Sequence, residues 1–347
     1  MVEIELKFQI SEARRTALLK ALDPKKSETI QLQAKYFDTP DRLLAQHGAA
    51  LRQRLEGACW IQTLKAAGKS HLHRFEHNHN LGELESSPEL DLSIYQAIPE
   101  AQQILTQALG SDAAALKLTF ETDIQRTYRV IEFEDAEIEV CLDVGVVRAS
   151  GREQTIHEVE FELKSGSVQS LLAFSFEWVK KYQLWLDVRS KAEMGNLLAL
   201  EQTVSPARFE KEFVLSKKES AAHNLSLLIG QQMQHLLPNI AAISAGVAEQ
   251  SHIDQAQTAL EHLQLTLALF KDWNSNISDK WAMQLAAFKH QFDHLQHLQH
   301  MQSTLGAFLQ NPTTTENLAK DILYAQEKLG NLVKSTQNVH HYLELLT

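Results

Sequence analysis

The segment Glu3-Ile4-Glu5-Leu6-Lys7 alternates charged and apolar residues, and it decides how the first half of this sequence is interpreted. Successive side chains of a β-strand point to opposite faces, so the pattern predicts a strand with Glu3, Glu5 and Lys7 on one face. A single strand of this kind usually exposes its charged face to water. The alternation becomes informative only where other segments repeat it.

Several later segments repeat the alternation and carry blocks of charge on one face. They are Arg52 and Arg54; Thr63 and Lys65; Arg74 and Glu76; Glu137, Glu139 and Asp143; and Glu158, Glu160, Glu162 and Lys164. Like charges on one strand face repel each other unless something neutralises them. An ordinary solvated sheet would mix the signs and include Thr, Ser and Gln, so these faces require a different environment.

Two arrangements accommodate such strands. In an open sheet the charged faces meet water, whereas in a closed barrel they face inward and the apolar faces point outward toward covering helices. A dry interior is excluded, because desolvating carboxylates costs several kcal/mol each. A water-filled tunnel that holds divalent cations and a polyanion would balance both the negative and the positive side chains. Glutamate oxygens suit Mg²⁺ or Mn²⁺, and arginine and lysine supply donors for phosphate oxygens.

The sequence changes character near residue 200. Short alternating segments precede this point, and long Leu-, Ala- and Gln-rich stretches with helical spacing follow from about residue 210, with Pro238 and Pro312 expected at turns. Helices are also predicted over Ser11–Leu22, Ser167–Tyr182 and Ser190–Leu200. With Glu201–Pro206 as linker, we expect an α+β domain over residues 1–200 and an all-α helical bundle over residues 207–347.

Composition and charge narrow the classes of function. The net charge of −11 disfavours nucleic-acid binding, which usually needs a basic excess. Cys59 and Cys141 lie in apolar-alternating segments and are predicted to be reduced and buried. Neither a secretory signal nor an apolar run long enough to span a membrane is recognised. We therefore expect a cytoplasmic protein with neither a nucleic-acid nor a membrane partner.

The charged landmarks, taken in order, resemble the CYTH family, also called the triphosphate tunnel metalloenzymes. Glu3, Glu5 and Lys7 match its Glu-x-Glu-x-Lys signature. The further matches are Tyr36-Phe37-Asp38-Thr39, Leu51-Arg52-Gln53-Arg54, Thr63-Leu64-Lys65, Arg74 with Glu76, Arg126, Glu139 with Asp143, the run Glu158, Glu160 and Glu162, and Ser190-Lys191-Ala192. A lone signature is common by chance, but this ordered set over residues 1–200 is specific.

The resemblance implies an eight-stranded antiparallel β-barrel tunnel with flanking helices, open at both ends and lined by charges. A barrel followed by a helical CHAD domain is similar to bacterial inorganic triphosphatases. This order favours metal-dependent hydrolysis of inorganic triphosphate to pyrophosphate and phosphate. The alternatives are hydrolysis of thiamine triphosphate or a nucleotide, a class IV adenylate cyclase, and a non-catalytic polyphosphate-binding protein.

The resemblance also suggests roles for individual residues. The expected substrate-binding residues are Arg52, Arg54, Lys65, Arg74, Arg126 and Lys191. The expected metal ligands, for two Mg²⁺ or Mn²⁺ ions, are Glu3, Glu5, Glu139, Asp143, Glu158, Glu160 and Glu162. Lys7, Lys65 and Glu160 are the candidate catalytic residues. One ion would bridge phosphate oxygens, and the other would position and acidify the attacking water.

Structural roles compete with these assignments at several positions. Asp38 is expected to fix a turn ahead of Pro40 rather than to contact substrate. Glu137 and Glu158 lie at tunnel mouths or on a metal, and the sequence favours neither. The histidines His71, His73, His77 and His79 alternate around Arg74 and Glu76, which favours a loop or edge strand over a metal site.

The C-terminal half resembles a CHAD domain only loosely. It is short for such a domain, and it lacks the excess of basic residues that is typical of one. His290, His294, His297 and His300 follow one side of a predicted helix, opposite Phe288, Phe292 and Leu295. We expect a solvated histidine face and a degenerate or truncated CHAD domain that acts as a scaffold or as the interface of a homodimer.

Overall fold

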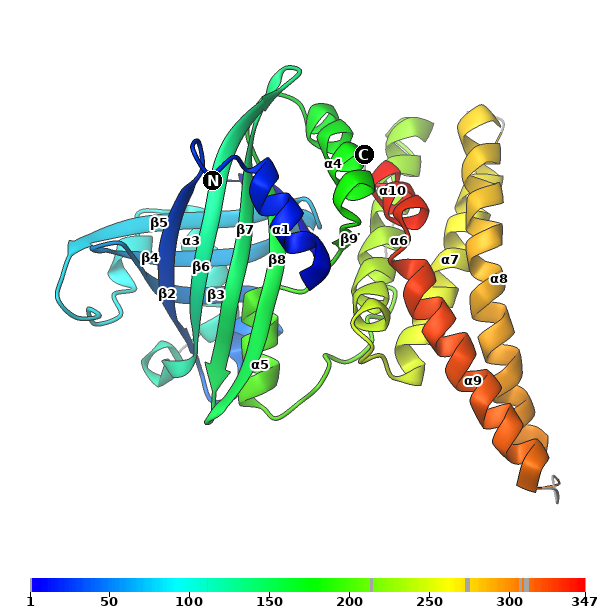
Figure 1. Ribbon diagram of the computed structural model, residues 1–347. Coiled ribbons are helices and arrows are strands. Elements are labelled where there is room, and N and C mark those ends of the chain that lie inside the picture. The colour runs from blue at the N-terminus through cyan, green and yellow to red at the C-terminus, as the bar shows by residue number, and fades with distance from the viewer. Residues whose placement is uncertain are drawn as a thin grey trace. The chain divides into compact units, whose positions relative to one another are not determined.

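The computed structural model describes residues 2–110, 112–212, 215–271, 275–305, 308 and 312–346. The chain divides into two compact units, Met1–Ser205 and Pro206–Thr347. Figure 1 shows strands in the first unit and helices alone in the second. Within the described residues, no helix combines the length and apolarity that crossing a membrane requires.

Eight antiparallel strands close into a barrel in the first unit. The strands are β1 (Val2–Gln9), β2 (Glu28–Asp38), β3 (Ala49–Glu56), β4 (Cys59–Ser70), β5 (His73–Glu83), β6 (Lys117–Phe133), β7 (Ala136–Ala149) and β8 (Arg152–Ser165). Their spatial order is β5-β4-β3-β2-β6-β7-β8-β1, and pairing of β1 with β5 completes the ring. A short strand, β9 (Trp185–Leu186), adds to β1. The predicted eight-stranded barrel is confirmed.

Tight turns suited to hairpins join neighbouring strands. Ser150 and Gly151 both have positive φ, of 51° and 74°, between β7 and β8. Two successive residues of this conformation match the right-handed twist of the flanking strands. The local sequence therefore helps to fix the register that brings β7 and β8 side chains together.

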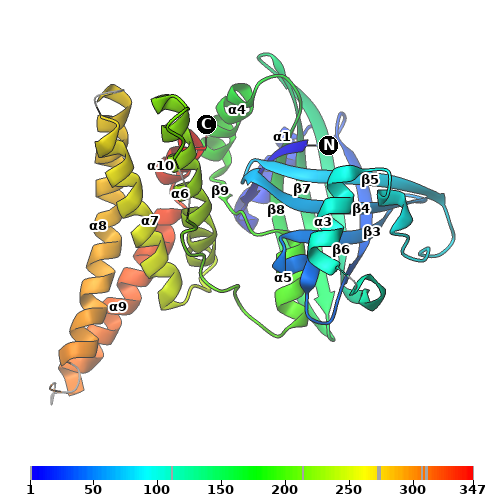
Figure 2. The same cartoon turned by 180° about the vertical axis from the view of Figure 1, so that it is seen from behind.

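The apolar strand faces point outward and are covered by helices. Phe161 packs against Phe8 and against Phe174 of α4 (Val168–Tyr182), with ring centroids 5.1 and 5.2 Å apart. On the far side, Leu51 and Leu64 belong to a core formed with η1 (Ser93–Tyr95) and α3 (Pro99–Leu109), and Figure 2 shows α3 lying over β3, β4 and β5. The remaining helices of this unit are α1 (Glu12–Ala21), α2 (Leu43–Gln46), η2 (Asp112–Ala115) and α5 (Lys191–Ala199).

One part of the barrel interior departs from the expected charged lining. Residues directly opposite each other across a strand pair point to the same side, and Tyr36 lies opposite both Arg52 and Phe120. The Tyr36 and Phe120 side chains join Ile124, Val147 and others in an apolar cluster that includes Met194 of α5. The charged tunnel lining therefore does not extend to this end of the barrel, where α5 packs instead.

The second unit contains five helices among the described residues, as expected for an all-α unit. They are α6 (Ala221–Ser244), α7 (Gln250–Leu269), α8 (Ser275–Leu305), α9 (Pro312–Val333) and α10 (Thr336–Glu344). The prediction of a turn at Pro238 is wrong, because Pro238 lies inside α6. The apolar surface that α6 buries outweighs the single backbone hydrogen bond that a proline removes. Pro312 instead begins a helix, where its missing N–H costs little.

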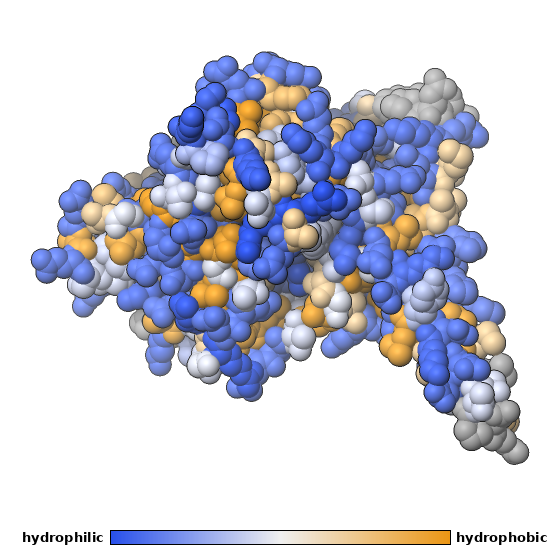
Figure 3. Space-filling model, in the orientation of Figure 1, coloured by the Kyte–Doolittle hydropathy of each residue, from blue (hydrophilic) through white to orange (hydrophobic). Residues whose placement is uncertain are grey.

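The histidine row of α8 lies on the surface, as predicted. His290, His294, His297 and His300 are all exposed, whereas Phe288, Phe292 and Leu295 are buried. More generally, hydrophilic residues predominate on the face of the molecule seen in Figure 3 and are interrupted by smaller hydrophobic patches. Both cysteines are free thiols, as expected, but only Cys141 is buried, and Cys59 is half-buried.

Candidate active site

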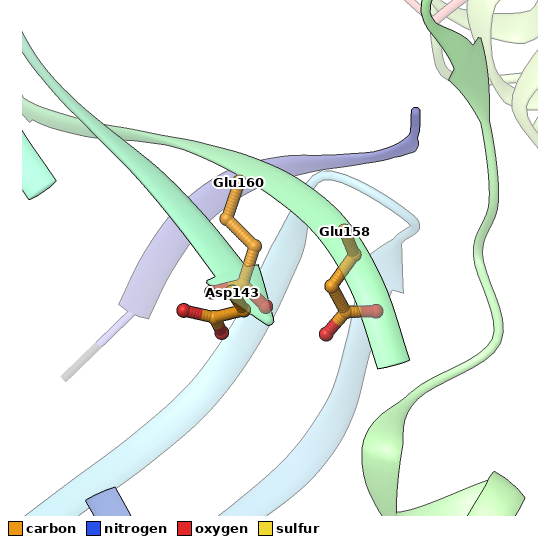
Figure 4. A group of neighbouring side chains, drawn as sticks. All are labelled: Asp143, Glu158 and Glu160. Atoms are coloured by element: carbon orange, nitrogen blue, oxygen red, sulfur yellow. The ribbon is translucent and has the colours of Figure 1, made fainter. Parts of the chain in front are cut away.

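Strand register brings the inward carboxylates of β7 and β8 together. Asp143 lies directly opposite Glu158, and Cys141 lies opposite Glu160. One oxygen each from Asp143, Glu158 and Glu160 can lie within 4.8 Å of the others. In Figure 4 the three side chains extend from these two neighbouring strands toward one space. We call these three residues the carboxylate cluster.

Three cationic side chains neutralise the carboxylate cluster. Arg126 donates to both oxygens of Asp143 at 2.7 Å and to Glu160 at 2.5 Å. The Lys191 ammonium lies 2.8 Å from oxygens of Asp143 and Glu160, and it also pairs with Glu158. Lys7 lies 3.2 Å from Glu158. Three negative and three positive groups therefore share a region almost closed to water.

The cationic neighbours reverse the effect of burial on the acids of the carboxylate cluster. Burial alone would raise the pKa of Glu160, but Lys191 and then Arg126 lower it well below its usual range. The same two cations lower the pKa of Asp143 against its burial. Both groups are therefore carboxylates at neutral pH, which is the form that binds a cation.

A second group of charges forms where β1 meets β5 and closes the barrel. Lys65 lies 2.8 Å from Glu3 and 2.6 Å from Glu76, and Arg74 lies 3.0 Å from Glu5. Burial raises the pKa of Glu3 to about 8 despite the Lys65 ammonium. Burial would also raise the pKa of Glu76, but Lys65 lowers it. Burial thus favours the protonated form of Glu3, whereas Lys65 favours the ionised form of Glu76.

Two arginines of β3 extend the positive lining toward β2. The Arg52 guanidinium donates to the Tyr36 hydroxyl at 3.4 Å, and its buried Nε has no hydrogen-bond partner among the described residues. Arg54 donates to Glu56 at 2.6 Å. Burial, together with neighbouring Arg52, lowers the pKa of Arg54 to about 10. Crowded cations and an unsatisfied buried donor are the features expected of an anion site.

Glu139 of β7 and Glu162 of β8 lie at the end of the charged lining that is more exposed to solvent. Lys164 pairs with Glu162 at 2.9 Å and with Glu139 at 3.3 Å, and about a third of its side chain is exposed. Lys164 therefore lies near the solvent-exposed rim of the lining. Glu137 is exposed and accepts a hydrogen bond from Ser165, so it also lies at this end.

The structure bears on the roles of three features for which the sequence offered alternatives: Glu158, Asp38 and the histidines near β5. Glu158 is fully buried within the carboxylate cluster, which excludes a tunnel mouth for it. Asp38 accepts hydrogen bonds from the backbone N–H groups of Thr39, Leu44 and Ala45, which is the structural role expected. His71 lies in the turn between β4 and β5, and His73, His77 and His79 lie in β5.

Sequence reasoning missed some members of the site. Glu76 was recognised as an inward-facing charge, but its place beside Glu3 depends on barrel closure. Asp187 was not recognised, although it is buried, accepts three hydrogen bonds from Arg189, and donates its backbone N–H to the Lys7 carbonyl at 3.0 Å. It thereby ties the segment before α5 to β1. The only local signal was an acid beside an apolar pair, Trp185 and Leu186.

The donor set of the carboxylate cluster fits a hard divalent cation. Its ligands are carboxylate oxygens, which Mg²⁺ and Mn²⁺ prefer, and no thiolate or imidazole is among them. The lowered pKa values keep Asp143 and Glu160 ionised without a metal. The ammonium of Lys191 lies against all three ligands and would have to withdraw from them when an ion binds.

A curated protein is similar in sequence to part of this chain. A relative in Haemophilus influenzae named inorganic triphosphatase is 33% identical over 227 residues, which are 63% of this chain and 62% of that protein. The chain therefore spans less than two thirds of the length of this curated relative.

Solved structures are similar to somewhat more than half of the chain. A putative adenylate cyclase from Bacillus halodurans is 23% identical, covers 52% of this chain and 89% of its own, and has a TM-score of 0.37. A putative adenylyl cyclase from Hippeastrum, described as having a dominant triphosphatase activity, is 17% identical, with 58% and 97% covered and a TM-score of 0.41.

A family model, the CYTH domain, matches residues 1–195. The matched residues contain every candidate site residue, whereas the helical unit lies outside them, so its likeness to CHAD stays a prediction. Because the matched residues make up more than half of the chain, this protein belongs to the CYTH domain family.

Proposed function

We propose that this protein hydrolyses inorganic triphosphate to pyrophosphate and phosphate inside the barrel, in a metal-dependent reaction. The observation that carries the proposal is the lining itself, in which a carboxylate cluster lies against Arg126, Lys191 and Lys7 within a closed barrel. The name of the Haemophilus influenzae relative supports the choice of inorganic triphosphate.

Asp143, Glu158 and Glu160 are the first candidates to hold the metal ion. Glu3, Glu5, Glu139 and Glu162, the other predicted ligands, lie farther along β1, β7 and β8 and are candidates for a second ion. A bound Mg²⁺ or Mn²⁺ would supply charge neutralisation at phosphate oxygens and a more acidic water. Mg²⁺ is our first choice because every candidate ligand is a hard oxygen donor.

The cations of the lining would bind and orient the substrate. Arg52 and Arg54 repel each other, and the buried Nε of Arg52 lacks a hydrogen-bond acceptor. An anion between them would reduce the repulsion and accept that hydrogen bond. Lys65, Arg74, Arg126 and Lys191 are paired with carboxylates when no substrate is present. Metal ions would take over those carboxylates and release these cations for phosphate oxygens. Positioning and charge neutralisation are the main demands of phosphoryl transfer.

The two strongest candidates for catalysis are Glu160 and Lys65. Glu160 is held ionised and lies in the carboxylate cluster, where it could orient a water for in-line attack. Lys65 is buried between Glu3 and Glu76 and would face the charge that develops on the phosphoryl group. Lys7, opposite Glu160 in the register, would assist at the same end.

Phosphate release from inorganic triphosphate tests the proposal. Wild-type protein should release phosphate only with Mg²⁺ or Mn²⁺, and Glu160→Gln and Lys65→Ala should each lower kcat by at least about 100-fold, the usual cost of removing one preorganised catalytic group. Glu153→Gln, on the outer face of the same strand, is the matched control and should retain activity. Near-normal turnover in both site variants would refute these assignments, and a panel with ATP and thiamine triphosphate decides between substrates.

A further inference from the structure

A buried carboxylate, that of Asp187, lies beside Lys7 and outside the carboxylate cluster. β9 pairs antiparallel with β1, with Leu186 opposite Phe8. The next pair in this register is Asp187 with Lys7, and the Asp187 N–H donates to the Lys7 carbonyl at 3.0 Å. Because residues directly opposite each other point to the same side of a sheet, Asp187 faces the barrel interior together with Lys7. Only 1% of the Asp187 side chain is exposed.

Arg189 binds both oxygens of this carboxylate. It donates its backbone N–H at 3.0 Å and its Nε at 3.1 Å to Oδ1 of Asp187, and it donates its Nη2 at 2.7 Å to Oδ2. Burial alone would raise the pKa of Asp187, but Arg189 and Lys7 lower it, so Asp187 is ionised at neutral pH. A carboxylate whose oxygens are both bonded to one guanidinium has little capacity left for a metal ion.

The Lys7 ammonium depends on neighbouring carboxylates for its position. Its buried Nζ makes no hydrogen bond among the described residues, and it lies 3.2 Å from an oxygen of Glu158. Glu158 also pairs with Lys191 and is a candidate metal ligand. A metal ion that binds Glu158 would therefore take this counter-charge away from Lys7. Asp187 would remain beside Lys7, because Arg189 already occupies its oxygens.

We propose that Asp187 and Arg189 form a positioning pair for the metal centre. Asp187 holds the Lys7 ammonium in place when a metal ion binds Glu158, and Arg189 keeps Asp187 from binding that ion. The pair adds one negative and one positive group to a set of charges that is already balanced. Removing either member therefore changes the net charge beside the carboxylate cluster. The part of this inference that concerns the metal ion rests on the proposed function.

Opposite charge changes at the two residues should have opposite effects on metal binding. Asp187→Asn keeps the size of the side chain and leaves one extra positive charge, so the Mg²⁺ affinity measured by calorimetry should fall about tenfold. Arg189→Met leaves one extra negative charge, so the Mg²⁺ affinity should rise by about the same factor. The double variant restores the charge balance and should bind Mg²⁺ more nearly as wild type does than either single variant.

A purely structural pair would behave differently. All three variants would then bind Mg²⁺ more weakly than wild type, and that result would overturn the proposal. Asp38→Asn is the matched control, because Asp38 is a buried carboxylate of the same barrel that accepts backbone hydrogen bonds from its own loop. It should lower the stability of the protein and leave the Mg²⁺ affinity unchanged. If Asp187→Asn does not fold, Arg189→Met decides, because only the electrostatic role predicts tighter Mg²⁺ binding.

A double-mutant cycle in the metal-free protein separates this inference from the proposed function. Lys7→Met and Asp187→Asn remove the two charges singly and together, and urea unfolding gives the unfolding constant of each variant. The effect of both changes should differ from the product of the single effects by at least about fivefold, as expected for groups in contact. Independent effects would overturn the proposal. Absence of metal-dependent phosphate release from triphosphate would instead reject the proposed function, and the cycle would still decide whether Asp187 holds Lys7.

Discussion

Replacing Lys191 with methionine tests whether an ammonium and a metal ion compete for the same three carboxylates. In the metal-free protein, Asp143, Glu158 and Glu160 are balanced by Lys191, Arg126 and Lys7. Lys191→Met removes one positive charge from this neutral set and leaves a buried carboxylate without its partner. Breaking one partner of a buried pair typically costs about 3–5 kcal/mol. Only 13% of the Lys191 side chain is exposed, so solvent screening reduces this value little.

Urea unfolding with and without Mg²⁺ measures the effect. At a slope of about 2–3 kcal/mol/M, the metal-free variant should unfold at a urea concentration about 1–2.5 M lower than wild type. Mg²⁺ should raise the midpoint of the variant more than that of wild type, because it replaces the lost charge without displacing an ammonium. Lys180→Met, at an exposed position of α4, is the control and should behave as wild type. An unchanged midpoint, or a deficit that Mg²⁺ does not reduce, would contradict the competition.

Three further predictions address other parts of the molecule. Burial raises the pKa of Glu3 to about 8, so metal-free wild type should lose stability as pH rises from about 5 to 9, and Glu3→Gln should flatten that profile in urea unfolding. Gly195→Ala should lower the free energy of unfolding by about 1–3 kcal/mol through overlap with Phe120, whereas Gly230→Ala in open space within α6 should raise it by up to about 1 kcal/mol. Burial lowers the pKa of His341 to about 4, so up to about 3 kcal/mol should be lost as pH falls from about 6.5 to 4, a loss that His341→Phe should abolish in thermal unfolding. A sloping profile for Glu3→Gln or His341→Phe, or equal effects of the two alanines, would contradict the respective prediction.

The closed barrel and its inward charges could be predicted because strand alternation is a local property of sequence. Glu158, Glu160 and Glu162 share a face wherever β8 lies, so a like-charged face is visible without any structure. The ordered family landmarks then supplied the number of strands. What no local pattern contains is the register between strands, which sets Asp143 opposite Glu158 and brings Glu3 beside Lys65 and Glu76. The carboxylate cluster and the group formed by Glu3, Lys65 and Glu76 are products of that register.

The filled end of the barrel could not be predicted for a different reason. Leu32, Ala34 and Tyr36 alternate with polar residues on β2, and a rule that places charges inward would turn these apolar side chains outward. They face inward because α5 supplies a second apolar surface inside that end, where Tyr36 stacks on Phe120 with ring centroids 4.4 Å apart. An apolar face needs only a partner to cover it, whichever side of the sheet the partner occupies. The helix that covers this face also carries Lys191, so one element sets both the apolar packing at this end and a cation of the carboxylate cluster.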